Sequence, residues 1–89
     1  MYLYENKGIG TKLIEEVIEV AKIQKCKRVW LITTNANVRA IRFYQKRGFN
    51  MKALYINAVN ESRKIKPEIP ILGYDNIPIL HEIEFEKMI

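Results

Sequence analysis

The sequence has 89 residues, of which 48% are hydrophobic and 28% charged, and its formal net charge is +5. Such a chain is long enough for one small globular domain and does not have a disordered composition. Its apolar runs are too short to span a membrane, and its first residues do not resemble a secretory signal, so we expect no membrane association. The single cysteine, Cys26, excludes an internal disulfide and favours a cytoplasmic location. The positive charge suits an anionic partner, either a nucleic acid or a phosphorylated cofactor.

The first part of the chain predicts a helix followed by a strand. Apolar residues recur at helical spacing over residues 9–24: Ile9, Leu13, Val17 and Ala21 fall four apart, and Ile14 and Ile18 lie on the adjoining stripe. Residues 29–34 form an apolar run without alternation, which is typical of a strand buried on both faces.

A second helix is predicted over residues 38–47. Either Asn35 or Asn37 could cap its first turn, because asparagine side chains accept hydrogen bonds from the free N–H groups of a helix start. Gly48 follows the helix where a left-handed residue is needed to end it. The residues after it, 49–59, predict a strand.

The remaining segments predict a hairpin and a last strand. Residues 60–66 form a loop or a single helical turn. The sequence Ile-Pro-Ile-Leu occurs at both 69–72 and 77–80, and its prolines favour a loose or edge hairpin. Residues 81–88 alternate, with apolar side chains inward and glutamates outward. The order helix–strand–helix–strand–hairpin–strand indicates a single α+β domain over residues 1–89, with a small mixed sheet packed against two helices.

Two glycines lie just before the first predicted helix, in the stretch ENKGIG. A helix start attracts phosphate through its free N–H groups and its dipole, and Gly8 and Gly10 leave room for a diphosphate to approach the backbone. Lys7 adds positive charge. The order of the residues after Gly10 excludes a P-loop, and the missing third glycine excludes a dinucleotide-binding fingerprint. A tight turn that only starts the helix is the simpler alternative.

The stretch TTNANVRAIRFYQKRGF, residues 33–49, resembles the second signature of the GNAT superfamily of acetyl-CoA-dependent N-acetyltransferases. ENKGIG resembles the first signature, although Glu5 stands where the family has Gln or Arg. Residues 66–86 resemble the closing segment of many small members. The resemblance therefore implies the C-terminal half of a GNAT-like fold, without the strands and helices that precede the glycine turn in the family. It also implies acetyl-CoA as cofactor and transfer of its acetyl group to a primary amine, on a small molecule or a protein.

The resemblance also implies roles for particular residues. The pyrophosphate of coenzyme A would lie against the turn formed by Asn6, Lys7, Gly8, Ile9, Gly10 and Thr11. Asn37 would lie near the pantetheine arm. Tyr44 would donate a proton to the thiolate that leaves when an amine attacks the thioester. The pKa values of a free phenol and a free thiol, about 10 and 8.5, are close enough for this transfer. No general base and no metal site are indicated.

Other interpretations stay open. Tyr44 could be only a core aromatic residue, and Asn37 only a helix cap. The chain could be an inactive remnant or a partner subunit that binds coenzyme A. A small basic nucleic-acid-binding module is a further alternative, although no recognised motif supports it. Without upstream strands, residues 29–34 would form an exposed apolar sheet edge, so we expect a homodimer.

Overall fold

The computed structural model describes residues 1–3 and 10–89 of the chain. In chain order the elements are α1 (Thr11–Ile23), β1 (Arg28–Thr34), α2 (Val38–Lys46), β2 (Asn50–Tyr55), α3 (Ala58–Ser62), a single 3-10 turn (Tyr74–Asn76) and β3 (Glu82–Met88). The structure thus confirms the predicted α+β class and the order of the predicted elements, and the short helix α3 begins slightly before the loop or single helical turn predicted over residues 60–66. Within the described residues, no helix has the length and apolar character that crossing a membrane requires.

The three strands form one sheet in the order β1–β3–β2, and both pairings are antiparallel. Phe85 in the central strand pairs with Leu31 on one side and with Met51 on the other. The first residues of the chain run parallel to β1: the N–H of Leu3 donates to the carbonyl of Trp30 at 2.7 Å, and the N–H of Trp30 donates to the carbonyl of Met1 at 2.9 Å. The three strands of the sheet are therefore antiparallel rather than mixed as predicted, and in the described residues parallel pairing at the β1 edge is limited to this one bridge.

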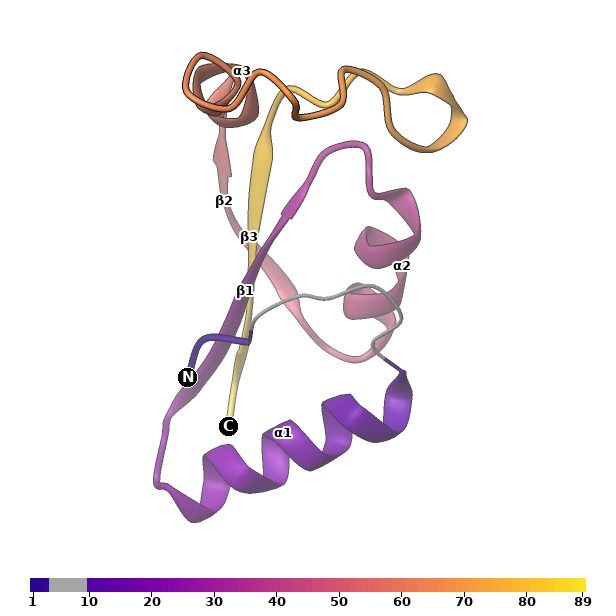
Figure 1. Cartoon of the computed structure of the whole chain (residues 1–89). Coiled ribbons are helices and arrows are strands. Elements are labelled where there is room, and N and C mark those ends of the chain that lie inside the picture. Colours follow the sequence, from indigo (N-terminus) through magenta and orange to yellow (C-terminus); the bar gives the residue numbers. More distant parts are fainter. Residues whose placement is uncertain (4–9) are drawn as a thin grey trace.

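Both long helices lie on the same side of the sheet, α1 across one end and α2 beside the strands (Figure 1). The core lies between them and the sheet. Its fully buried members include large side chains from each layer: Tyr44, Phe49, Phe85, Leu31 and Val29. Burial of apolar surface stabilises a fold by about 25 cal/mol per Å² and is the dominant favourable term in folding.

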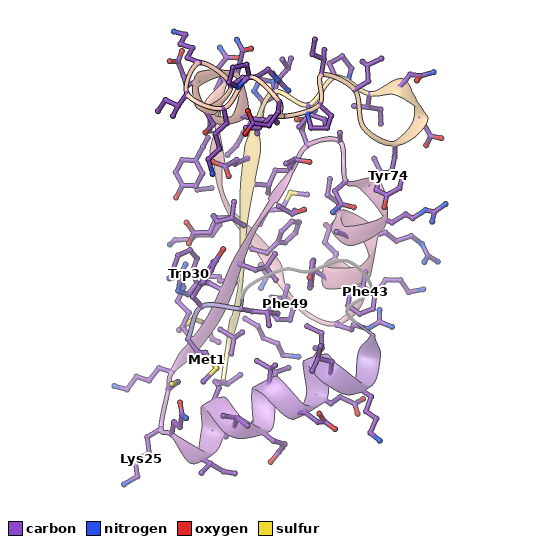
Figure 2. The ribbon with its side chains drawn as sticks, viewed as in Figure 1. Met1, Lys25, Trp30, Phe43, Phe49 and Tyr74 are labelled. Carbon is purple, nitrogen blue, oxygen red and sulfur yellow. The ribbon has the colours of Figure 1, made fainter. Side chains whose placement is uncertain are left out.

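β1 is covered on one face only, so the prediction of a strand buried on both faces is wrong. Val29 and Leu31 are 0% exposed and Thr33 is 5% exposed, whereas the residues between them are partly exposed. The reason is that α1 and α2 cover the same side of the sheet (Figure 1). Trp30 lies on the other side, away from both helices (Figure 2).

The inward face of α1 is centred closer to the adjoining stripe of Ile14 and Ile18 than to the stripe of Leu13. Ile14 and Ala21 are buried, but Leu13 is 47% exposed. Each residue turns a helix by about 100°, so a face centred on Ile14 leaves Leu13 toward the solvent. The helix ends where Lys25 adopts a left-handed φ of 59°.

The strand predicted over residues 49–59 is shorter than expected, because β2 ends at Tyr55. Asn57 adopts a left-handed φ of 61°, which breaks the extended backbone and starts α3. The N–H of Val59 then donates to the carbonyl of Leu80 at 3.0 Å, which ties α3 to the residues before β3.

The end of α2 follows the prediction. Gly48 adopts a left-handed φ of 86°, and the N–H of Phe49 donates to the carbonyl of Tyr44 at 3.0 Å. Lys87 of β3 adds a long-range contact, since its Nζ donates to the carbonyl of Arg47 at 2.8 Å. A cation is favourable at this negative end of the helix dipole.

The predicted hairpin is also present. The N–H of Gly73 donates to the carbonyl of Ile77 at 2.9 Å, and the N–H of Ile79 donates to the carbonyl of Ile71 at 2.8 Å. The hairpin extends from α3 past the end of β1 to the beginning of α2 (Figure 1). The sequence repeat at 69–72 and 77–80 therefore marks its two arms.

Candidate functional site

The start of α1 is the first part of the predicted cofactor site. Gly10 stands at the N-cap with an extended backbone, φ −92° and ψ 168°. A Cβ added at Gly10 would meet no heavy atom within 4 Å. Glycine is thus required here neither by the backbone conformation nor by the described neighbours. The first turn of α1 carries no acidic residue, so its positive end is not neutralised from within the helix.

Four of the residues predicted to bind the pyrophosphate, Asn6, Lys7, Gly8 and Ile9, lie outside the described residues. Thr11 is the first residue of α1, and its backbone is described. Of the predicted pyrophosphate-binding residues, the structure therefore describes only Gly10 and Thr11, where the helix begins.

Asn37 caps α2, as one of the two alternatives predicted. Its Oδ1 accepts a hydrogen bond of 3.3 Å from the N–H of Ala40, and its Nδ2 donates to Oγ1 of Thr33 at 3.2 Å. Thr33 is 5% exposed and belongs to the covered face of β1. The amide group of Asn37 is therefore oriented from two sides, by the helix it caps and by the strand beside it.

Tyr44 lies on the same side of α2 as Asn37, because seven residues are almost two full turns. The two positions are about 10 Å apart along the axis at 1.5 Å per residue. Tyr44 is 2% exposed, and its ring centroid lies 5.3 Å from that of Phe43, 5.5 Å from that of Phe49 and 6.1 Å from that of Phe85. Tyr44 is therefore a core residue in this structure, and its proposed role as a proton donor stays a prediction.

The outer edge of β1 also presents backbone groups. The first residues of the chain hydrogen-bond to β1 at Trp30 and at the carbonyl of Arg28, so these residues turn their backbone groups away from β3. Backbone groups alternate along an antiparallel strand, which turns the N–H and C=O of Ile32 to the same outer edge. A ligand with amide groups could pair with the edge at this point.

A charged cluster lies on the sheet face that α1 and α2 do not cover. Arg28 forms ion pairs with Glu84 and, at 2.6 Å, with Glu86. The hydroxyl of Tyr55 donates to Oε1 of Glu84 at 2.6 Å. This hydrogen bond holds the pKa of Glu84 below its ordinary value, with Arg28 acting in the same direction, and it raises the pKa of Tyr55. Glu84 and Glu86 are thus paired with neighbours rather than simply solvated.

His81, the one histidine of the sequence, makes a structural contact, since its Nδ1 accepts a hydrogen bond of 2.8 Å from the N–H of Asn57. In the part of the chain that the structure describes, no three His, Cys, Asp or Glu side chains are grouped as metal ligands would be.

Two contacts in the candidate site could not be predicted from the sequence alone. Thr33 orients Asn37, and Asn35 hydrogen-bonds to the hairpin through its side chain. Two asparagines after a predicted strand indicated that one of them caps the next helix, but the sequence did not show which one. The partners of Asn35 are more than forty residues away in the chain, so no local pattern reveals them.

The comparison with protein families gives a match over residues 3–49 to the family described as "Acetyltransferase (GNAT) family". The protein YdhI of Bacillus subtilis, described as uncharacterized, is 53% identical over 87 residues, which are 98% of this chain and 54% of that protein. The spermine/spermidine N(1)-acetyltransferase of the same species is 43% identical over 47 residues, 52% of this chain and 31% of that protein. The chain therefore spans about half the length of the curated relatives that it matches along most of its sequence.

Solved structures share this fold. A GNAT family acetyltransferase from Elizabethkingia anophelis, determined with acetyl-CoA bound, matches with a TM-score of 0.77 at 24% identity, over 96% of this chain and 52% of that one. An IAA acetyltransferase from Bacillus cereus matches with a TM-score of 0.78 at 22% identity, over 96% and 53% of the two chains.

Proposed function

The chain belongs to the GNAT family of acetyltransferases, and on this premise we propose that it binds acetyl-CoA and contributes to transfer of the acetyl group to a primary amine. The matching family region, residues 3–49, includes the glycine turn, Asn37 and Tyr44, to which the resemblance assigns roles at the cofactor. A cytoplasmic location and a homodimer paired along a sheet edge belong to the same proposal.

The start of α1 carries the proposal. The N-terminal N–H groups and the helix dipole favour a phosphate group, and Lys12 is the only charged residue in the first turn. The open space around Gly10 allows a diphosphate to approach the backbone closely. The neighbouring edge of β1 would receive the amide groups of the pantetheine arm at Ile32, and Asn37 would add a polar contact.

Acetyl transfer would then occur beside α2. A neutral amine nitrogen would form a bond to the acetyl carbon while the bond from that carbon to sulfur breaks. The attacking nitrogen gives up its extra proton to solvent, and the thiolate takes up a proton. We propose the phenol of Tyr44 as its source, since a donor with a pKa close to that of the leaving group transfers a proton efficiently in a shielded site. Burial of Tyr44 at 2% exposure supplies the shielding.

The same burial supports a second candidate function. A tyrosine packed among three phenylalanine rings is also what a purely structural core needs. In that case the chain would bind coenzyme A without turnover, as a subunit of a larger enzyme. Since the chain spans about half the length of its relatives, we propose that turnover requires a further segment corresponding to their remaining half.

The acceptor is proposed as an amine, with polyamines as the first compounds to test. This choice rests on the relative named spermine/spermidine N(1)-acetyltransferase, which matches 52% of this chain. The chain itself shows no acceptor-binding residue in its described part that would select one amine over another.

Thermal unfolding with added coenzyme A tests the cofactor site. At a concentration of about one hundred times Kd, a ligand stabilises a protein by about 2.7 kcal/mol, which raises Tm by about 15 °C in a domain of this size. Gly10→Val should remove this protection and preserve the fold, because the backbone there is extended and the space is open. Gly10→Ala, with a smaller side chain, should lose only part of it. Protection that survives Gly10→Val would place the diphosphate elsewhere.

Salt dependence separates this function from nucleic-acid binding. A shift assay with duplex DNA should show at most weak binding that falls steeply with salt, as phosphate-backbone contacts do. DNA binding that exceeds coenzyme A binding at physiological salt would favour the nucleic-acid alternative.

A further inference from the structure

We propose that Asn35 is a positioning residue: it fastens the hairpin of residues 69–80 to the turn before α2 and thereby fixes Asn37 in the orientation that the cofactor needs. The inference rests on the proposed cofactor binding, but its structural part can be tested without any ligand. Figure 1 shows the hairpin reaching the beginning of α2.

The side chain of Asn35 makes hydrogen bonds in two directions. Its Oδ1 accepts from the N–H of Leu80 at 3.0 Å and from the N–H of His81 at 2.9 Å. Its Nδ2 donates to the carbonyl of Pro78 at 2.9 Å, and its backbone N–H donates to the carbonyl of His81 at 3.0 Å. One side chain thus joins the end of β1 to the residues that lead into β3.

The tip of the hairpin packs directly on the turn that follows Asn35. A Cβ added at Gly73 would lie 2.9 Å from the Cβ of Ala36, closer than such atoms approach in proteins. Ala36 itself is 1% exposed. Tyr74 extends the contact onto α2, where the guanidinium carbon of Arg39 lies 5.2 Å from the centre of its ring (Figure 2). The hairpin therefore packs closely on the turn before α2 and reaches the first turn of α2 through Tyr74.

The other end of the hairpin is held by Arg63, which follows α3. Its guanidinium donates to the carbonyls of Pro70 and Ile79, each at 2.7 Å, and of Ile69 at 3.2 Å. Both arms of the hairpin are thereby fixed to α3. Because the tip of the hairpin contacts Ala36, this attachment also restricts movement of the turn before α2.

The start of α2 depends on such support. The helix has nine residues, and a helix of this length is marginal without tertiary contacts. Its first hydrogen bonds run from the N–H of Ile41 to the carbonyl of Asn37 at 3.0 Å and from the N–H of Ala40 to the side chain of Asn37 at 3.3 Å. A shift of the preceding turn would move both the cap and the amide group of Asn37.

Amide hydrogen exchange in the 89-residue chain tests this inference without ligand. In Asn35→Ala, exchange at Ala40 and Ile41 should be faster by about fivefold or more, the equivalent of losing a helix cap. Val29→Ala is the control, since it shortens a buried side chain at the opposite end of β1 and lowers stability without touching the hairpin. It should leave the relative protection of these two amides unchanged.

A second pair of variants uses the close contact at the hairpin tip. Gly73→Ala should increase exchange at Ala40 and Ile41, because its new Cβ would push the hairpin away from Ala36. Combining it with Ala36→Gly removes the opposing Cβ, and exchange should return to the level of Ala36→Gly alone. This rescue would not occur if Gly73→Ala acted through general destabilisation.

Calorimetric titration with coenzyme A completes the test. Asn35→Ala should raise the Kd about tenfold, as expected when a hydrogen bond to the ligand is misaligned, while Val29→Ala should keep the wild-type Kd. Unchanged exchange at Ala40 and Ile41 in Asn35→Ala would overturn the inference, as would faster exchange with an unchanged Kd. If the wild-type chain binds no coenzyme A, the proposed function fails, and the exchange result alone decides whether Asn35 positions the start of α2.

Discussion

The Oδ1 of Asn37 accepts a hydrogen bond of 3.3 Å from the N–H of Ala40, so the predicted cofactor ligand is also the cap of α2. The two roles can be separated by substitution. Asn37→Ala removes the cap and should lower the free energy of unfolding by about 1 kcal/mol. Asn37→Asp keeps an acceptor for the N–H of Ala40 and should change stability by less than about 0.5 kcal/mol. Urea unfolding measures both.

Coenzyme A binding by Asn37→Asp tests whether Asn37 is also a cofactor ligand. Asn37→Asp replaces an amide donor by a carboxylate, so it should weaken coenzyme A binding although the fold is kept. Calorimetric titration would show the change. An aspartate variant with wild-type affinity would mean that Asn37 is only a cap.

Stability in acid should depend on the hydrogen bond from Tyr55 to Glu84. This bond, together with Arg28, lowers the pKa of the Glu84 carboxyl in the folded chain. The carboxylate therefore contributes stability above the unfolded-state pKa of about 4.3, and the contribution is lost as the pH falls through the lower folded-state value. Thermal unfolding from pH 7 to pH 3 should show a steeper decline for wild type than for Glu84→Gln.

The control for the pH profile is an exposed carboxylate on α1. Glu19 is 68% exposed at its side chain and forms an ion pair with Lys22 at 3.8 Å. Glu19→Gln should keep the wild-type profile, because exposed pairs of this kind contribute little. Equal slopes for wild type and Glu84→Gln would show that the pair with Tyr55 does not act in this range.

Gly10 and Gly48 both lie next to a helix end, but their substitution by alanine should change stability by different amounts. Gly48 has a left-handed φ of 86°, and a Cβ there would lie 3.2 Å from Nζ of Lys87. Gly48→Ala should cost about 1 kcal/mol in urea unfolding, because an L-residue is strained in this conformation. Gly10→Ala serves as the matched change, since its φ of −92° is ordinary and its surroundings are open. A similar loss at both positions would refute this explanation.

The comparison of Gly10 with Gly48 also shows what the sequence can predict. Gly48 after a helical pattern and before an aromatic residue indicates a helix stop from local chemistry alone, and the structure confirms it. The element order was likewise predictable from periodicity. Local signals failed where a tertiary contact decides: the exposure of Leu13 depends on which side of α1 meets the sheet, and the end of β2 depends on a left-handed Asn57.

The candidate site divides in the same way. The signatures around the glycine turn and α2 predicted the family, and the family match confirms it. The choice between Asn35 and Asn37 as cap could not be made, because both asparagines precede the helix and both suit a cap. The two asparagines differ because the hairpin and the residues after it, which are far away in the sequence, form hydrogen bonds with the side chain of Asn35.

Self-association is expected at an open sheet edge. Residues 29–34 are less exposed than predicted, since Val29 and Leu31 are fully buried and the first residues hydrogen-bond to the outer edge of β1. The opposite edge, β2, carries Met51 and Leu54, which are 53% and 57% exposed. Sedimentation should show a dimer at high concentration that Leu54→Lys disrupts, since a charge at a strand edge opposes pairing. A monomer at high concentration would contradict the homodimer, and a dimer that survives Leu54→Lys would place the contact at β1.

The last prediction concerns turnover. The 89-residue chain should acetylate amines very slowly, because a thioester that is misplaced by about 1 Å can lose a hundredfold in rate. Turnover should rise when a segment corresponding to the remaining half of the relatives is supplied. In that assembly Tyr44→Phe should lower kcat by about a hundredfold and keep coenzyme A affinity, because the hydroxyl acts only as the thiolate leaves.

Phe43→Leu is the control for Tyr44→Phe. It alters packing beside Tyr44 without removing a hydroxyl, so it should lower stability more than kcat. Equal kcat for wild type and Tyr44→Phe would show that Tyr44 serves core packing alone, and rapid turnover by the 89-residue chain would show that it needs no further segment.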